Sequence, residues 1–137
     1  MDRASSVPAS ALGPARRLFD QGLADFRAGK FFEAHDIWEE LWQELRGPDR
    51  LFLQGLIHLA VGAYHRDNGN PRGATSQWRK AVLKLERYPE GHWGVDTSEW
   101  RAWTRLYQEN QSREDHPNDL PFDPSGFPAV LPLAPRS

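Results

Sequence analysis

The run LFLQGLIHLAVGAYH, from Leu51 to His65, constrains the fold of this chain more than any other feature. It is shorter than the roughly 18 uninterrupted apolar residues of a membrane-spanning helix, but it has the length of a buried core helix. At about 100° per residue, its polar residues Gln54, His58 and His65 fall within an arc of about 40°. The segment is therefore expected to be a buried helix with one polar stripe, and no membrane association is expected.

Composition limits the class of protein. A chain of 137 residues is expected to form one domain that buries its own core. The absence of cysteine excludes disulfides and thiolate metal sites, and a net charge of −2 argues against nucleic-acid binding. The N-terminal sequence MDRASSVPASALG has no apolar segment typical of a secretory signal, so we expect a cytoplasmic location.

Helical periodicity and its stop signals predict an all-α fold. Five helices are expected, at about 14–29, 31–45, 48–67, 71–88 and 98–112, with Pro48 and Pro71 at first-turn positions and Asn70 and Ser98 as caps. We expect residues 1–12 to be disordered and residues 13–112 to form the helical bundle. The proline-rich residues 113–137 are expected to form an extended tail that packs on the bundle.

A weak internal repeat has an offset of 40 residues. It superposes Gly29 on Gly69, Ala34 on Ala74 and Trp38 on Trp78. This spacing is typical of tetratricopeptide-like helical hairpins, in which a small residue lets two helices approach closely. Two hairpins are too few for an open solenoid, so the repeat favours a compact bundle with the fifth helix and the tail packed on it.

The predicted helix at 31–45 offers a counterpart to the polar stripe. His35 and Glu39 lie outside its charged face and are flanked by Trp38 and Trp42. The connection to the next helix at Gly47-Pro48 is very short, so the two helices should pack antiparallel with their polar stripes facing. The predicted site therefore combines seven residues: His35, Glu39, Gln54, His58 and His65, with Trp38 and Trp42 beside them.

Several interpretations of this cluster stay open. It could be a solvent-facing edge, or an internal hydrogen-bond network that fixes the register of two helices. It could be a pocket for a small molecule, or a site for a divalent metal such as zinc, iron or manganese, with His35, Glu39 and His65 as ligands. Trp38 also has the spacing of a core residue, as do Trp78, Trp100 and Trp103.

The basic residues of the fourth helix are interpreted as a solvated face and not as a nucleic-acid surface, because Glu86 lies among them. They are Arg79, Lys80, Lys84 and Arg87.

The segments FFEAHDIWEELW, FLQGLIHLAVGAYHRDNGNPRGA and KAVLKLERYP resemble the domain-of-unknown-function 309 family of small bacterial and archaeal helical proteins, over about residues 15–90. The first family motif is matched at Phe32, Ala34, His35, Asp36, Glu39 and Trp42, and the second at Leu53, Gln54, Gly55, Leu56, Ile57, Ala60 and His65. Asp36 replaces the family's glutamate, and His58 stands where the family has glutamine. With His58 set aside, the site contracts to His35, Glu39, Gln54 and His65. The resemblance implies an all-α bundle and no particular activity.

Two hypotheses about function follow. In the first, the chain is a non-enzymatic module that binds a small ligand or a protein through the cluster, and its tail lies along the bundle with Phe122 and Phe127 as anchors. The second is a metal-dependent hydrolase or oxygenase that uses His35, Glu39 and His65. The sequence leaves open whether the protein is an enzyme and whether it forms a homodimer.

Overall fold

The protein is a bundle of five helices, as a computed structural model shows for residues 9–88, 97–113, 120 and 122–128. The helices are α1 (Ala9–Arg27), α2 (Phe31–Glu44), α3 (Pro48–Asp67), α4 (Pro71–Leu85) and α5 (Thr97–Gln111), followed by a short 3₁₀ turn, η1 (Pro124–Gly126). Within these ranges there is no strand, which confirms the expected all-α class. None of these helices is both long and apolar enough to cross a membrane.

The helix boundaries follow the predicted stop signals closely. Pro48 and Pro71 occupy first-turn positions, and the Asn70 side-chain oxygen accepts a hydrogen bond from the Gly73 N–H at 3.0 Å. The fifth helix differs, because it begins at Thr97 and places Ser98 inside its first turn. The first helix begins earlier than expected, at Ala9, but Gly13 at φ 36° interrupts it just before Pro14. The rest of the expected disordered N-terminus lies outside the described residues.

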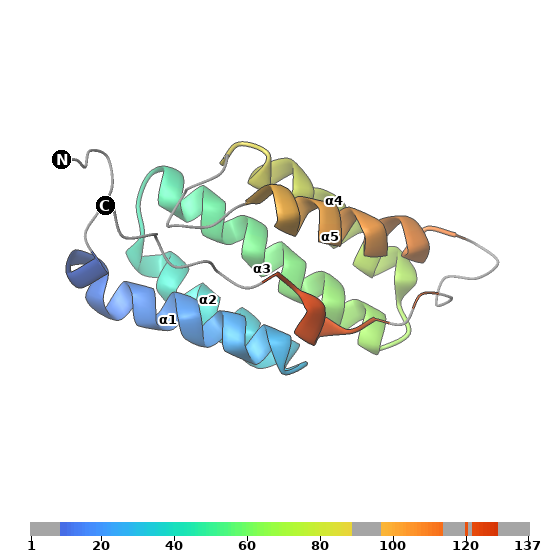
Figure 1. Ribbon diagram of the computed structural model, residues 1–137, viewed down its shortest axis with the longest axis horizontal. Helices are drawn as coiled ribbons and strands as arrows, with labels where there is room; N and C mark the ends of the chain where they lie inside the picture. The colour runs from blue at the N-terminus through green and yellow to red at the C-terminus, as the bar shows by residue number, and fades with distance from the viewer. Residues whose placement is uncertain (1–8, 89–96, 114–119, 121, 129–137) are drawn as a thin grey trace, which may run out of the picture.

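Each helix packs against the next one along the chain, from α1 to α5. Figure 1 shows α3 in the middle, between the α1–α2 pair and the α4–α5 pair. The buried side chains come from all five helices, and the largest that are fully buried include three indoles, Trp38, Trp78 and Trp100. The central position of α3 explains its nearly continuous apolar sequence.

The two helical hairpins repeat one contact at the 40-residue offset found in the sequence. The Trp38 indole lies against Gly22 and its Nε1–H donates to the Phe19 carbonyl at 3.3 Å. The Trp78 indole lies against Gly62 and donates in the same way to a carbonyl of α3, that of Leu59, at 3.0 Å. The similarity to tetratricopeptide hairpins beyond this contact stays a prediction.

The described part of the tail packs on the bundle through Phe122 and Phe127. Phe127 is fully buried, and its ring centroid lies 5.1 Å from that of Phe26 in α1 and 5.0 Å from that of Trp100 in α5. The Trp100 Nε1–H donates to the Pro128 carbonyl at 3.0 Å. Figure 1 shows this segment, in red, between α1 and α5. The remainder of the predicted tail falls outside the described residues.

Candidate functional site

Residues from three consecutive helices line a cavity of about 310 Å³, which we call the main pocket. Its lining residues are His35, Glu39 and Trp42 from α2, Gln54, Ile57, His58 and Val61 from α3, and Gln77 from α4. The polar side chains on α2 and α3 meet because a short connection makes these helices pack against each other. Five residues of the predicted cluster therefore share one cavity: His35, Glu39, Trp42, Gln54 and His58.

The hydrogen-bonding groups of the main pocket are partly paired with one another. His35 lies between two carboxylates, with Nδ1 at 3.3 Å from Asp36 Oδ1 and Nε2 at 3.6 Å from Glu39 Oε2. His58 Nδ1 lies 2.7 Å from Gln77 Oε1, and an amide oxygen only accepts, so this nitrogen carries the proton. The Nε2 atom of a neutral His58 ring is then an acceptor.

Burial lowers the pKa of His58 below its ordinary value of 6.5. The hydrogen bond with Gln77 opposes this shift, while the positive charges of Lys84 and Lys80 on α4 add to it. The direction of the shift favours a neutral imidazole in the main pocket at neutral pH.

Trp42 contributes an indole N–H that has no acceptor among the residues that the structure describes. The guanidinium of Arg50 lies 3.7 Å from the centroid of the Trp42 ring, which is the distance of a cation–π contact. Arg50 thus stacks on the indole of Trp42, which is one of the residues that line the main pocket. A buried donor without an acceptor is costly, so it is a natural partner for a ligand acceptor.

A second, more apolar cavity of about 210 Å³ adjoins the main pocket, and we call it the aromatic pocket. It is lined by Phe31, Phe32, His35, Val61, Tyr64 and His65, so it shares His35 and Val61 with the main pocket. Phe32 and Tyr64 are 58 % and 43 % exposed, and their ring centroids lie 6.0 Å apart. Two large aromatic rings left open to solvent beside a polar cavity are typical of a binding surface.

Two residues of the predicted cluster lie outside the main pocket. His65 lines the aromatic pocket, where its Nδ1 is 3.3 Å from the side-chain nitrogen of Asn70. Trp38 lines neither cavity, because it is fully buried against Gly22. Gln77, on the next helix, was not predicted as a site residue. Apart from its polar side chain, no motif or spacing in the sequence indicates that it belongs to the site.

The three candidate metal ligands, His35, Glu39 and His65, do not form one group. Across the described ranges, no set of three histidine, aspartate or glutamate side chains is placed to hold a metal ion. His35 and Glu39 approach each other to 3.6 Å, whereas His65 Nδ1 lies 3.3 Å from the side-chain nitrogen of Asn70. The arrangement offers hydrogen-bond donors and acceptors beside an apolar surface.

This site falls within the segment that resembles known proteins. Residues 19–77 match the model of the family described as Domain of unknown function (DUF309). The resemblance seen in the sequence is thereby confirmed. The matched segment runs from α1 to Gln77, so it contains every residue that lines the main and aromatic pockets.

A protein of Aquifex aeolicus (strain VF5), described as an uncharacterized protein, is 28 % identical over 79 residues. These residues make up 57 % of this chain but only 24 % of that relative. The chain thus matches about a quarter of a much longer protein. The DUF309 match and this relative describe a domain without an assigned activity.

Proposed function

We propose that this protein is a non-enzymatic binding module whose site is the joined main and aromatic pockets. The observation that carries the proposal is that a cavity with several polar side chains adjoins an aromatic one, the two sharing His35 and Val61 as lining residues. Ligand sites commonly combine an apolar lining with a few placed polar groups in this way. The Trp42 N–H without an acceptor and the exposed rings of Phe32 and Tyr64 support the same conclusion.

The lining residues favour a ligand with an aromatic part, a cationic or hydrogen-bond-donating head, and an acceptor for the Trp42 N–H. Glu39 supplies a carboxylate to the main pocket, and neither lysine nor arginine is among the residues that line the two cavities. Neutral His58 adds an acceptor at Nε2. A peptide in which an aromatic side chain adjoins a lysine or arginine fits this description, because its backbone carbonyls can accept from Trp42. An arylalkylamine supplies the aromatic and cationic parts alone.

A matched pair of small probes tests the proposal. Phenethylamine and 3-phenylpropionate have the same aromatic group but opposite charges. In saturation-transfer NMR titrations, phenethylamine should bind and 3-phenylpropionate should bind more weakly by about tenfold, the factor that corresponds to one charge-assisted contact. Equal binding of both probes, or binding of neither, would count against the proposed ligand chemistry.

Variants locate the binding to the two pockets. Phe32→Ala and Glu39→Gln should each weaken phenethylamine binding, because they remove the aromatic surface and the carboxylate. The matched controls are Leu83→Ala and Glu33→Gln, which alter exposed side chains that line neither cavity. If the control variants weaken binding as much as the pocket variants do, the probe binds elsewhere.

A further inference from the structure

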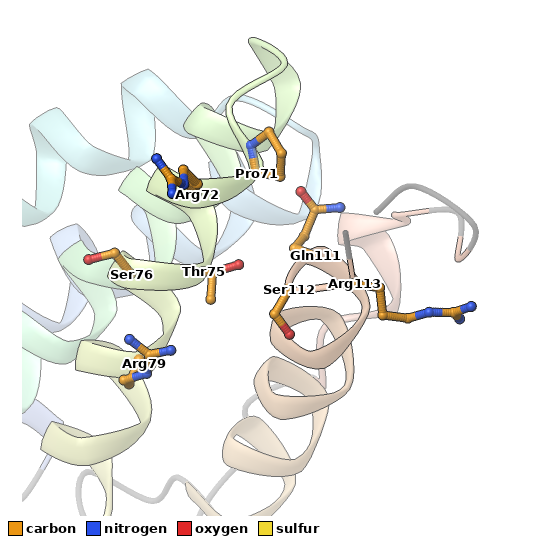
Figure 2. Close-up of a pocket in the computed structure, with 8 residues that line it drawn as sticks. All are labelled: Pro71, Arg72, Thr75, Ser76, Arg79, Gln111, Ser112 and Arg113. Atoms are coloured by element: carbon orange, nitrogen blue, oxygen red, sulfur yellow. The ribbon is translucent and has the colours of Figure 1, made fainter. Parts of the chain in front are cut away.

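A third cavity, of about 420 Å³, lies between the beginning of α4 and the end of α5. We call it the α4–α5 pocket, and Figure 2 shows its lining: Pro71, Arg72, Thr75, Ser76, Arg79, Gln111, Ser112 and Arg113. Three of these residues are arginines and none is acidic. No residue of the main or aromatic pocket takes part, so this is a separate place on the molecule.

Thr75 gives the strongest indication of a binding site. Its side chain is 9 % exposed, and its hydroxyl oxygen is buried with no hydrogen-bond partner in the described part of the chain. In Figure 2 this hydroxyl is turned from α4 toward the space in front of α5. Leaving a buried hydroxyl unpaired costs about 1–3 kcal/mol, so it is expected to have a partner when the site is in use.

The groups around Thr75 are those that bind an anion. Arg72, Thr75 and Arg79 follow one another at spacings of three and four residues, which places them on one face of α4. Pro71 is the first residue of α4, so the positive end of the helix dipole adjoins this pocket. Arginine is suited to phosphate because its planar guanidinium donates two parallel hydrogen bonds to phosphate oxygens.

We propose that the α4–α5 pocket binds the phosphate group of a small phosphate monoester. Arg72 and Arg79 of α4 supply the charge, and the Thr75 hydroxyl donates to a phosphate oxygen. A cavity of this size holds more than a phosphate ion, because ligand sites of about 300–1,000 Å³ accommodate drug-sized molecules. The side chains of Ser76 and Gln111 extend the polar lining beyond the arginines.

The proposal is tested by adding inorganic phosphate, and then glycerol 3-phosphate, to the ¹⁵N-labelled full chain at constant ionic strength. Both should shift the backbone amide signals of residues 72–76 and 111–113, and glycerol 3-phosphate should bind more tightly. Tighter binding of inorganic phosphate would make the site one for the free ion and would overturn the monoester proposal. Chloride at the same ionic strength should leave these signals unmoved.

Three variants distinguish a specific binding site from a general attraction of anions to a basic surface. Thr75→Val removes the unpaired hydroxyl at nearly constant shape, so it should fold with equal or greater stability and yet bind glycerol 3-phosphate about tenfold more weakly. Arg79→Gln should also weaken binding, whereas Arg87→Gln, an exposed change outside the pocket, should not.

Equal weakening by Arg79→Gln and Arg87→Gln would overturn the proposal, because it would indicate a diffuse basic surface. A single-stranded oligonucleotide could instead shift the amide signals along the whole exposed face of α4 and bind more tightly than glycerol 3-phosphate. That result would overturn the proposal in favour of nucleic-acid binding. Unchanged amide signals at millimolar phosphate would overturn it as well.

Discussion

At the scale of single residues, the two indole–glycine contacts are the most demanding feature of the core. A methyl group at Gly62 would lie 2.4 Å from Trp78 Cδ1, whereas at Gly55, also in α3, it would lie 3.2 Å from the flexible end of Leu85. The ring cannot move without breaking its hydrogen bond to the Leu59 carbonyl. The close contact therefore fixes the distance between α3 and α4.

We predict that Gly62→Ala lowers the free energy of unfolding by about 2–3 kcal/mol, because it overpacks the core and displaces a hydrogen-bonded ring. Gly55→Ala is the matched control in the same helix, where the gain of about 1 kcal/mol in helix propensity offsets a milder clash. Urea unfolding of both variants measures the difference. Equal losses would contradict the proposed role of the Trp78 contact.

The pKa of His58 predicts how stability depends on pH. Burial lowers the pKa in the folded chain below 6.5, so near and below that pH the unfolded chain binds more protons than the folded chain. The stability associated with the neutral ring is present above pH 6.5 and is lost as the pH falls toward the lower folded-state pKa. His58→Gln should therefore lose less stability than the parent between about pH 7.5 and 5.5.

Thermal unfolding at several pH values, together with NMR titration of the His58 ring protons, measures this effect. A titration midpoint at or above 6.5 in the folded protein would contradict the burial argument.

At the scale of helices, the repeat supplies an internal comparison of two N-termini. Asn70 accepts a hydrogen bond from the Gly73 N–H, whereas Lys30, at the equivalent place before α2, makes no side-chain cap. We predict that Asn70→Ala lowers the free energy of unfolding by about 1 kcal/mol and Lys30→Ala changes it by less than about 0.5 kcal/mol. Urea unfolding measures both, and a larger loss in Lys30→Ala would refute the capping argument.

Helix boundaries could be predicted from the sequence because their signals are local. Proline at Pro48 and Pro71 and the cap at Asn70 act within one turn of the helices that they begin. The fifth helix begins at Thr97, so the predicted cap Ser98 lies inside its first turn.

The candidate site could be predicted only in part, because periodicity gives the direction of a side chain but not its position along the helix axis. His58 and His65 point in nearly the same direction, but seven residues at about 1.5 Å each separate them by about 10 Å along α3. They therefore reach different cavities. Gln77 joins His58 through the packing of α4 on α3, which no pattern within a single helix contains.

At the scale of the whole molecule, the described part of the tail contributes to the core. Phe127 is fully buried between α1 and α5, and the Phe122 ring centroid lies 4.9 Å from that of Tyr107 and 5.7 Å from that of Phe31. Phe31 also lines the aromatic pocket, but none of the tail residues that the structure describes lines either cavity. The described part of the tail therefore joins the first and last helices and leaves the proposed binding site open.

We predict that Phe127→Ala lowers the free energy of unfolding by about 3–5 kcal/mol, as expected for a buried phenylalanine, and that Phe127→Leu has a smaller effect. The control is Phe32→Ala at a largely exposed ring, which should change stability by about 0.5 kcal/mol or less. Urea unfolding of the three variants gives the comparison. A negligible loss in Phe127→Ala would show that the tail is not part of the folded core.

The central claim is that the joined main and aromatic pockets bind a ligand, and the most direct measurement is the structure of the protein with bound phenethylamine. The account predicts that its ring lies between Phe32 and Tyr64 and that its ammonium group lies within hydrogen-bond distance of Glu39. A ligand found beneath the tail segment 122–128, or in any place that leaves both pockets empty, would contradict the claim.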